Sequence, residues 1–141
     1  FGYDRVFGCE STQEEVYQAV GVRLLKNALN AYNGCIFAYG QTGSGKSHSV
    51  VGDVHNDVDQ GILPRACTQL FDMIGERTSS DQGFQATVLA SYLEIYNEKL
   101  FDLLSSGRES KDQLQVRSHP TLGCFVAGLT ETPINGFADA L

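Results

Sequence analysis

The sequence lacks the features that would place it among membrane, zinc-binding or nucleic-acid-binding proteins. No apolar stretch approaches the ~20 residues of a membrane span, and no signal peptide is visible. The cysteines show no C-x-x-C spacing, so we expect four reduced, mostly buried thiols of a cytosolic protein and no zinc site. Positive charge is scarce: ten Lys and Arg residues oppose 17 Asp and Glu residues, and the formal net charge of −7 discourages binding to nucleic acid.

The composition that is present indicates one globular domain. The chain has 141 residues, of which 42% are hydrophobic and 19% charged, as in folded proteins. Its ends are unusual, because residue 1 is Phe and residues 137–141 resemble the first turn of a helix after Pro133. We therefore expect residues 1–141 to be one domain that is truncated at both ends.

The most informative segment is an octapeptide that fits the phosphate-loop pattern G-x-x-x-x-G-K-[ST]. Its glycines permit backbone angles that let successive N–H groups turn inward and surround an anion. Its lysine can reach the β- and γ-phosphates of a nucleotide, and its serine hydroxyl can ligate Mg²⁺. The eight residues are Gly40, Gln41, Thr42, Gly43, Ser44, Gly45, Lys46 and Ser47.

The context of this octapeptide supports the same interpretation. The apolar run Cys35–Tyr39 precedes it and predicts a buried strand of a parallel sheet, and a helix is expected to begin near Gly45. The alternative is a Gly/Ser-rich surface loop that matches the pattern by chance. The preceding strand, the spacing and the Lys46-Ser47 pair favour a phosphate loop.

A long helix is predicted before the octapeptide. Ser11 and Glu14 form a capping-box pattern, and the helix should run to about Tyr32 before Asn33-Gly34 ends it. Residues 1–7 alternate between apolar and polar and give a weak strand signal. The buried face of the helix is expected to contain Val16, Val20, Leu24 and Leu25.

Two helices are predicted after the octapeptide. The first is short because Ser and Val residues are mediocre helix formers, and Gly52 should stop it. Asp53–Gly61 should form an exposed loop. The second helix is expected to begin at Pro64 and to end near Gly75 or Arg77, with a loop over residues 78–83.

Strand signals dominate the rest of the chain. Phe84–Tyr96 is the longest strand candidate, and Asn97 is expected to cap a short helix that runs through Leu104. Residues 105–112 form a polar linker. Residues 114–116 and 124–126 flank a turn with Pro120 and predict a small hairpin.

Four blocks of residues, in this order, resemble the kinesin motor domain over nearly the whole chain. The Ser at position 47 and the later His119-Pro120-x-x-Gly123 resemble the vesicle-transporting group of that family. The blocks are residues 1–7 with Gln13, Val16 and Tyr17; residues 33–47 (NGCIFAYGQTGSGKS); residues 61–65 (GILPR); and residues 91–98 (SYLEIYNE) followed by Asp102-Leu103-Leu104.

The resemblance implies an α/β fold of the P-loop NTPase type, with a central mixed sheet and helices on both faces. It also implies ATP hydrolysis coupled to stepping along a microtubule, with ATP or ADP and Mg²⁺ as cofactors and tubulin as the partner. The location would be the cytoplasm and its cytoskeleton, and the parent protein would carry a coiled coil.

The resemblance implies roles for single residues as well. The backbone of residues 41–46 would wrap the phosphates, and Ser47 would ligate Mg²⁺. His48 matches a position that lies against the adenine in some relatives; the alternative is an ordinary polar residue in the first turn of a helix. Residues 53–61 correspond to a loop of variable length near the nucleotide.

Residues further along the chain match a tubulin-contacting loop of the family. Arg117 and His119 fall in this loop, although an arginine here can also be just a solvated charge. Glu94 and Glu98 could suggest paired acid/base carboxylates, but no other feature of the sequence supports that. We expect no catalytic residue within these 141 residues.

Other parts of an NTPase are missing from the sequence. There is no strand-end Asp for the Mg²⁺ shell and neither of the switch motifs of the family. In the family, the switch-bearing strands separate the two strands that match Cys35–Tyr39 and Phe84–Tyr96, so we expect these two segments not to pair. Unpaired strand edges predict an unstable or aggregation-prone polypeptide. Without the switch motifs, we also expect this polypeptide not to hydrolyse ATP by itself.

Two other functions stay open at this point. A nucleoside or nucleotide kinase uses the same loop, but the six scattered arginines do not form an arginine-rich lid. A microtubule-binding relative without hydrolysis is the second alternative, and the intact Gly45-Lys46-Ser47 speaks against it.

Overall fold

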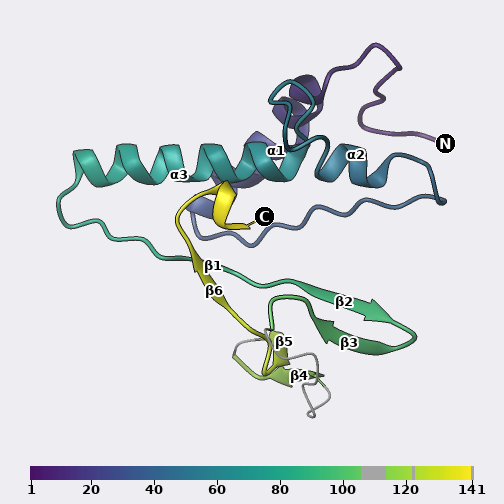
Figure 1. The fold of residues 1–141 in the computed structure, drawn as a ribbon. Helices are drawn as coiled ribbons and strands as arrows, with labels where there is room; N and C mark the ends of the chain where they lie inside the picture. Colours follow the sequence, from purple (N-terminus) through teal and green to yellow (C-terminus); the bar gives the residue numbers. More distant parts are fainter. Residues whose placement is uncertain (106–113, 122, 141) are drawn as a thin grey trace. The chain divides into compact units, whose positions relative to one another are not determined.

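The computed structural model describes residues 1–105, 114–121 and 123–140 (Figure 1). The chain divides into two units, Phe1–Phe84 and Gln85–Leu141, which are described separately. The first unit contains three helices and the second contains six short strands and a 3₁₀ turn among its described residues. None of the helices in the described part of the chain is both long enough and apolar enough to cross a membrane.

The first helix, α1 (Gln13–Leu29), begins one residue later than expected, with Thr12 as its N-cap. The hydroxyl of Thr12 accepts a hydrogen bond from the Glu15 amide at 3.2 Å, and the Glu15 carboxylate accepts one from the Thr12 amide at 3.0 Å. The capping box is therefore Thr12 and Glu15, and not Ser11 and Glu14. The helix ends at Leu29, three residues before Tyr32.

The buried face of α1 is also different from the expected one. Leu25 is buried as predicted, but Val16 and Leu24 are half-buried and Val20 is exposed. The buried residues recur every four positions, a spacing that keeps them on one side of a helix. They are Gln13, Tyr17, Gly21 and Leu25.

The second helix, α2 (Lys46–Val50), is short as predicted, and Gly52 follows it with a φ of 68°. The loop over residues 53–61 is present as expected. It is closed by an isolated bridge between Gly52 and Gln60 and by a 2.9 Å hydrogen bond from the Gly61 amide to the Val51 carbonyl.

The third helix, α3 (Ile62–Ser80), is longer at both ends than predicted. It begins two residues before Pro64, which is fully buried in the first turn, where a helical amide has no intrahelical partner to lose. It also continues through residues expected to form a loop. The hydroxyls of Thr78 and Ser79 donate to the carbonyls of Ile74 and Gly75 at 2.8 Å, so these polar side chains are satisfied within the helix.

The strand predicted over Cys35–Tyr39 is absent, and so is the weak strand over residues 1–7. Residues 35–39 have no regular structure, belong to no ladder and are exposed. A strand needs a neighbour to receive its backbone hydrogen bonds, and the unit Phe1–Phe84 contains no strand that could serve. The apolar composition of this segment was therefore not sufficient to predict its structure.

The described residues of the second unit form three two-stranded antiparallel sheets, whose strands are labelled in Figure 1. The pairs are β1 with β6, β2 with β3, and β4 with β5. Among the described residues this unit ends with the 3₁₀ turn η1 (Phe137–Ala140), where the sequence predicted a helical turn. The strands are β1 (Val88–Ala90), β2 (Leu93–Tyr96), β3 (Lys99–Asp102), β4 (Gln115–His119), β5 (Gly123–Ala127) and β6 (Thr132–Ile134).

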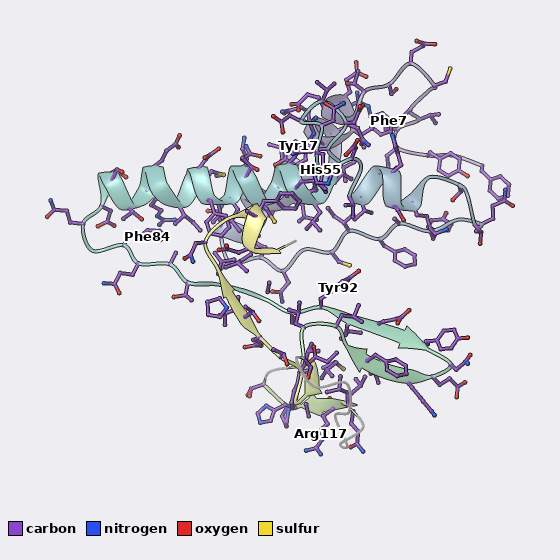
Figure 2. All side chains as sticks on the ribbon, viewed as in Figure 1. Phe7, Tyr17, His55, Phe84, Tyr92 and Arg117 are labelled. Carbon is purple, nitrogen blue, oxygen red and sulfur yellow. The ribbon has the colours of Figure 1, made fainter. Side chains whose placement is uncertain are left out.

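The long strand predicted over Phe84–Tyr96 is two strands with different partners, interrupted at Ser91-Tyr92. Figure 2 labels Tyr92, where the chain leaves β1 for β2. The backbone carbonyl of Tyr92 accepts a hydrogen bond from the Leu103 amide at 2.9 Å. The hairpin predicted near residues 114–126 is confirmed as β4 and β5, which are longer than expected. Most of the predicted linker, residues 106–112, lies outside the described residues.

The helix predicted to follow Asn97 is wrong. Asn97 and Glu98 have φ values of 48° and 61° and connect β2 to β3, with Tyr96 opposite Lys99. Two central residues with positive φ are typical of the type I′ turn of a tight hairpin. Asn is common at helix N-caps but is also one of the few residues that tolerate positive φ, and here the second property decides the structure.

The described residues form helices and small antiparallel sheets, and not the central mixed sheet that the family resemblance implied. Residues 35–39 enter no ladder among the described residues, and the expected lack of pairing between Cys35–Tyr39 and Phe84–Tyr96 stays a prediction. All four cysteines are free, as expected, but Cys9, Cys35 and Cys124 are exposed. Cys67 is half-buried, and burial raises the pKa of its thiol.

Candidate nucleotide-binding site

The octapeptide forms a glycine-shaped loop between the extended residues 33–39 and α2. Gly40, Gly43 and Gly45 have φ values of 152°, 81° and 88°, a region that residues with a Cβ rarely enter. The Ser44 amide donates to the Gln41 carbonyl at 3.2 Å and closes a turn inside the loop. The glycines are therefore required by the backbone path.

Several backbone N–H groups near the end of this loop have no hydrogen-bond acceptor among the described residues. The first amide to enter the α2 ladder is that of Ser49, which donates to the Gly45 carbonyl at 2.9 Å. The amides of Gly43, Gly45, Lys46 and Ser47 meet no acceptor among the described residues. Successive amides in such a turn form a concave group of donors that suits the oxygens of an anion.

The side chains of Lys46 and Ser47 add a cation and a hydroxyl to these amides. The Lys46 ammonium donates to the carbonyls of Gly40 and Gln41, both at 2.9 Å, which holds it across the loop. An ammonium has three hydrogens, so one is left for another acceptor. Ser47 is exposed, and no described residue bonds to its hydroxyl. This donor set fits a polyphosphate, with the Ser47 oxygen as a ligand suited to Mg²⁺.

The described residues contain no group of three or more His, Cys, Asp or Glu that could hold a metal ion by themselves. Mg²⁺ commonly keeps several waters and binds phosphate oxygens beside one or two protein ligands, and the exposed Ser47 hydroxyl would suit it as such a ligand.

A cavity of about 320 Å³ lies beside the loop. Its walls come mostly from apolar side chains of α1, α2, α3 and the extended segment before the loop, so it suits hydrophobic groups better than phosphate. Val20, Ile36, Phe37 and Val50 are among its lining residues. Phe37 and Tyr39 stack with ring centroids 5.7 Å apart.

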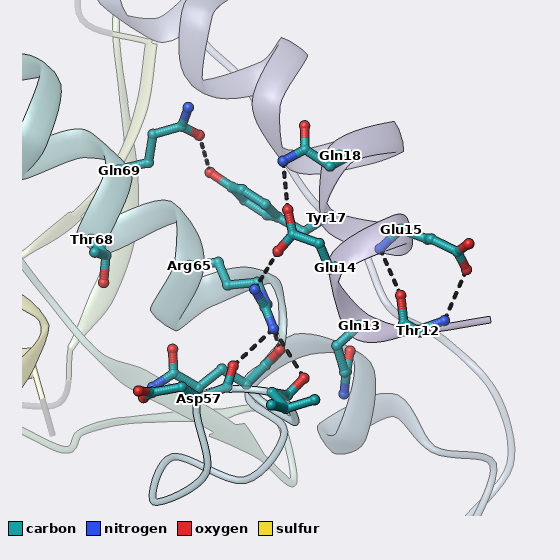
Figure 3. A network of polar contacts seen from close by, with 12 residues as sticks. Thr12, Gln13, Glu14, Glu15, Tyr17, Gln18, Asp57, Arg65, Thr68 and Gln69 are labelled. Carbon is teal, nitrogen blue, oxygen red and sulfur yellow. Dashed lines mark hydrogen bonds and ion pairs between the residues drawn. The ribbon is translucent and has the colours of Figure 1, made fainter. Parts of the chain in front are cut away.

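A network of polar side chains fixes the loop over residues 53–61 between α1 and α3 (Figure 3). Arg65 of α3 forms an ion pair with Glu14 of α1. Its guanidinium also donates to the backbone carbonyls of Gln60 at 2.9 Å, Asp57 at 2.9 Å and Val58 at 3.0 Å. One side chain thus connects two helices and a loop.

Tyr17 and Gln69 form a second connection between the same helices, in which the Tyr17 hydroxyl donates to the Gln69 side-chain oxygen (Figure 3). Burial, and next the nearby Glu14 carboxylate, raise the pKa of Tyr17, so the phenol keeps its proton and stays a donor. Sequence reasoning used Glu14, Tyr17 and Arg65 only as motif positions. It missed these contacts because no local pattern connects residues about 50 positions apart.

The other residues that the sequence analysis singled out lie outside the octapeptide. His48 is in α2 directly after Ser47, and Gln13 contacts it. Arg117 and His119 are exposed on β4 in the second unit, where Figure 2 labels Arg117. The His119 ring lies 3.2 Å from the amide of Thr121 and 2.9 Å from its hydroxyl. Glu94 lies on β2 and Glu98 in the following turn.

A phosphate loop consists of positive-φ glycines, a group of amides without acceptors, one ammonium and one hydroxyl. Residues 40–47 have all of these, so the chain belongs to the class of P-loop proteins. The comparisons with known proteins narrow this class. The family model described as "Kinesin motor domain" matches residues 1–141. The chain therefore belongs to the kinesin motor-domain family, whose members have a P-loop NTPase-type α/β fold and are microtubule-activated ATPases.

Two relatives illustrate the similarity. The kinesin-like protein unc-104 of Caenorhabditis elegans is 44% identical over 128 residues, which are 91% of this chain and 8% of that protein. The kinesin-like protein KIF13B of Homo sapiens is 40% identical over 147 residues, covering 99% of this chain and 8% of that protein. The chain thus spans a small part of the length of either relative.

Proposed function

We propose that this chain is the nucleotide-binding part of an ATP-driven microtubule motor. The observation that carries this proposal is the loop over residues 40–47, in which the amides of Gly43, Gly45, Lys46 and Ser47 have no acceptor among the described residues. The chain that contains it belongs to the kinesin motor-domain family. The proposed ligands are ATP and ADP with Mg²⁺, and the proposed partner is the microtubule in the cytoskeleton of the cytoplasm.

In this proposal the loop holds the nucleotide by its phosphates. The backbone of residues 41–46 wraps the phosphates with its free amides, and the Lys46 ammonium donates its remaining hydrogen to a phosphate oxygen. Ser47 holds Mg²⁺, which neutralises phosphate charge when bound. His48, in the next position of α2, lies against the base.

The second unit supplies the proposed contact with tubulin. Arg117 and His119 are exposed on the same strand, two residues apart, so both side chains stand on one face of the β4–β5 hairpin. The central mixed sheet belongs to this proposal as well, for the complete domain, because the described residues form only short two-stranded ladders.

The test is ATP hydrolysis by the full-length protein with and without microtubules. We expect microtubules to stimulate turnover, and Lys46→Ala to lower it at least about 100-fold because it removes the cation that faces the transferred phosphate. Lys26→Ala, on the exposed surface of α1, is the matched control and should leave turnover unchanged. Undiminished turnover in Lys46→Ala would contradict the proposal.

The same experiment separates the alternatives. Microtubule binding without turnover identifies a non-hydrolysing relative, and phosphate transfer to a nucleoside or nucleotide identifies a kinase. Either result would replace the motor function proposed here.

A further inference from the structure

Gln13 is the one buried polar or charged residue in the described part of the chain, and the phosphate loop does not include it. It is the first residue of α1, directly after the Thr12 cap, and only 7% of its surface is exposed. Figure 3 shows it at the start of that helix, apart from the Arg65 network. A buried amide needs hydrogen-bond partners, so its contacts indicate what it does there.

The Gln13 amide nitrogen is directed at α2. It donates to the backbone carbonyl of His48 at 2.7 Å and lies 3.4 Å from the carbonyl of Asp59. It also lies 3.3 Å from Nδ1 and 3.4 Å from Nε2 of the His48 ring. One side chain thus holds both the backbone and the ring of His48, from a position 35 residues away.

The short contact also fixes which end of the amide faces the ring. A carbonyl accepts only from a donor, so the amide NH₂ and not the amide oxygen must point toward His48. The ring nitrogen that meets this NH₂ therefore acts as an acceptor. Gln13 thereby contacts an imidazole whose residue is otherwise exposed, and it is almost equally close to both ring nitrogens.

We propose that Gln13 is a positioning residue that holds the imidazole of His48 in place to receive the nucleotide base. This inference rests on the proposed function, in which His48 lies against the base. A ring that is already fixed loses less conformational freedom when a ligand stacks on it, so preorganisation strengthens base binding and leaves phosphate binding alone.

The experiment compares two ligands of the full-length protein: Mg·ATP, and Mg·tripolyphosphate, which has the phosphates but no base. Gln13→Met keeps the side-chain length and removes the donor. We expect it to weaken Mg·ATP binding about 3- to 10-fold and to leave Mg·tripolyphosphate binding within about 2-fold of the unchanged protein. Gln18→Met, an exposed glutamine on the same helix, is the matched control and should alter neither affinity.

A double-mutant cycle tests whether Gln13 acts through His48. His48→Ala alone should weaken Mg·ATP binding selectively, and Gln13→Met should then add nothing in the His48→Ala background. If Gln13→Met does not fold, Gln13→Leu also removes the donor without adding a charge and is expected to give the same pattern.

Several outcomes would overturn the inference. Equal weakening of both ligands by the Gln13 variants would assign Gln13 a merely structural role, and no weakening would assign it none. If His48→Ala alone leaves Mg·ATP binding unchanged, the base contact fails and the inference fails with it. If the unchanged protein binds neither ligand, the phosphate loop itself is refuted, which distinguishes failure of the proposed function from failure of this inference.

Discussion

The helical unit, Phe1–Phe84, and the strand unit, Gln85–Leu141, are held together by different kinds of contact. In the helical unit, side chains form the long-range connections: Gln13 to His48, Glu14 to Arg65 and Tyr17 to Gln69. In the described part of the strand unit, backbone ladders form most of the long-range connections. The Asp102 carboxylate adds one by accepting a hydrogen bond from the Thr130 amide. Few side chains are fully buried in either unit.

This difference determines what each unit tolerates. Specific side-chain contacts in the helical unit should make single substitutions costly, since each removes a hydrogen-bond partner from a side chain that connects two segments. In the strand unit, the turn residues and the register should matter more than any exposed side chain, because the turn sets which residues pair. Four substitution experiments test this contrast.

Arg65→Met should be the most damaging of these substitutions. It removes the ion pair with Glu14 and leaves three backbone carbonyls without their donor. The Arg65 side chain is only 16% exposed, so we expect a cost of about 2–4 kcal/mol. Hydrogen exchange of the α1 and α3 amides measures it.

The control for Arg65 is Arg77→Met, on the same helix. Arg77 lies over the ring of Phe84 at 4.7 Å from its centroid, a contact worth about 0.5–1 kcal/mol at an exposed site. If Arg65→Met costs no more than Arg77→Met, the network in Figure 3 does not stabilise the helical unit.

Gly61→Ala tests the junction between α2 and α3. A Cβ at Gly61 would lie 2.6 Å from the Val50 carbonyl oxygen and 2.8 Å from that of Ser49, which forces the backbone apart. We expect destabilisation by about 1–3 kcal/mol. Gly75→Ala is the matched control inside α3, since its Cβ meets nothing within 4 Å, and should stabilise by about 0.4–1 kcal/mol. The same sign for both variants in urea unfolding would refute this packing.

Glu98→Gly tests whether residues 97–98 are a turn or the start of a helix. With a φ of 61° at Glu98, glycine relieves strain and should stabilise the β2–β3 hairpin by about 0.5–1 kcal/mol. In a helix the same change would destabilise by a similar amount. Exchange rates of the β2 and β3 amides give the sign. Glu94→Gly, inside β2, should destabilise in either case and serves as the control.

Asp102 should give the strand unit a pH dependence that appears only in acid. Hydrogen bonds from Thr130, through its side chain and then its amide, and from the amides of Leu104 and Ser105 lower the pKa of Asp102. The ionised carboxylate therefore contributes its full stability above the ordinary Asp pKa of about 3.9 and loses it as the pH falls toward the lowered pKa of the folded state.

Asp102→Asn should remove this acid-dependent part of the stability and leave the profile above about pH 5 parallel to that of the unchanged protein. Exchange of the Thr130 amide, which donates to Asp102 at 2.8 Å, is a direct probe across pH 3–6. An identical acid profile in the two proteins would mean that this hydrogen bond does not contribute.

Sequence reasoning predicted the helical unit better than the strand unit, for a physical reason. Helices α1, α2 and α3 follow from local caps and periodicity, and the errors at their ends were of one to five residues, the largest at the end of α3. The strands depend on partners that local patterns do not reveal. Phe84–Tyr96 was therefore predicted as one strand where two strands have different partners, and residues 35–39 were assigned a strand that has no partner.

The candidate site follows the same division. The backbone path of the loop followed from the sequence, since a glycine-rich motif carries its own geometry at Gly43 and Gly45, and the role of its residues in phosphate binding stays a prediction. Gln13 and Arg65 were not predicted as parts of the site's surroundings, because their contacts join residues far apart in the sequence. The aggregation expected from unpaired strand edges stays a prediction.

Hydrogen exchange at the amides of residues 43–47 in the full-length protein, with and without saturating Mg·ATP, tests the account at its foundation. Apart from that of Ser44, these amides have no acceptor among the described residues, so they should exchange quickly alone and at least about 10-fold more slowly once phosphate oxygens accept from them. Unchanged exchange at these amides under conditions where Mg·ATP is bound would place the nucleotide elsewhere and contradict the account.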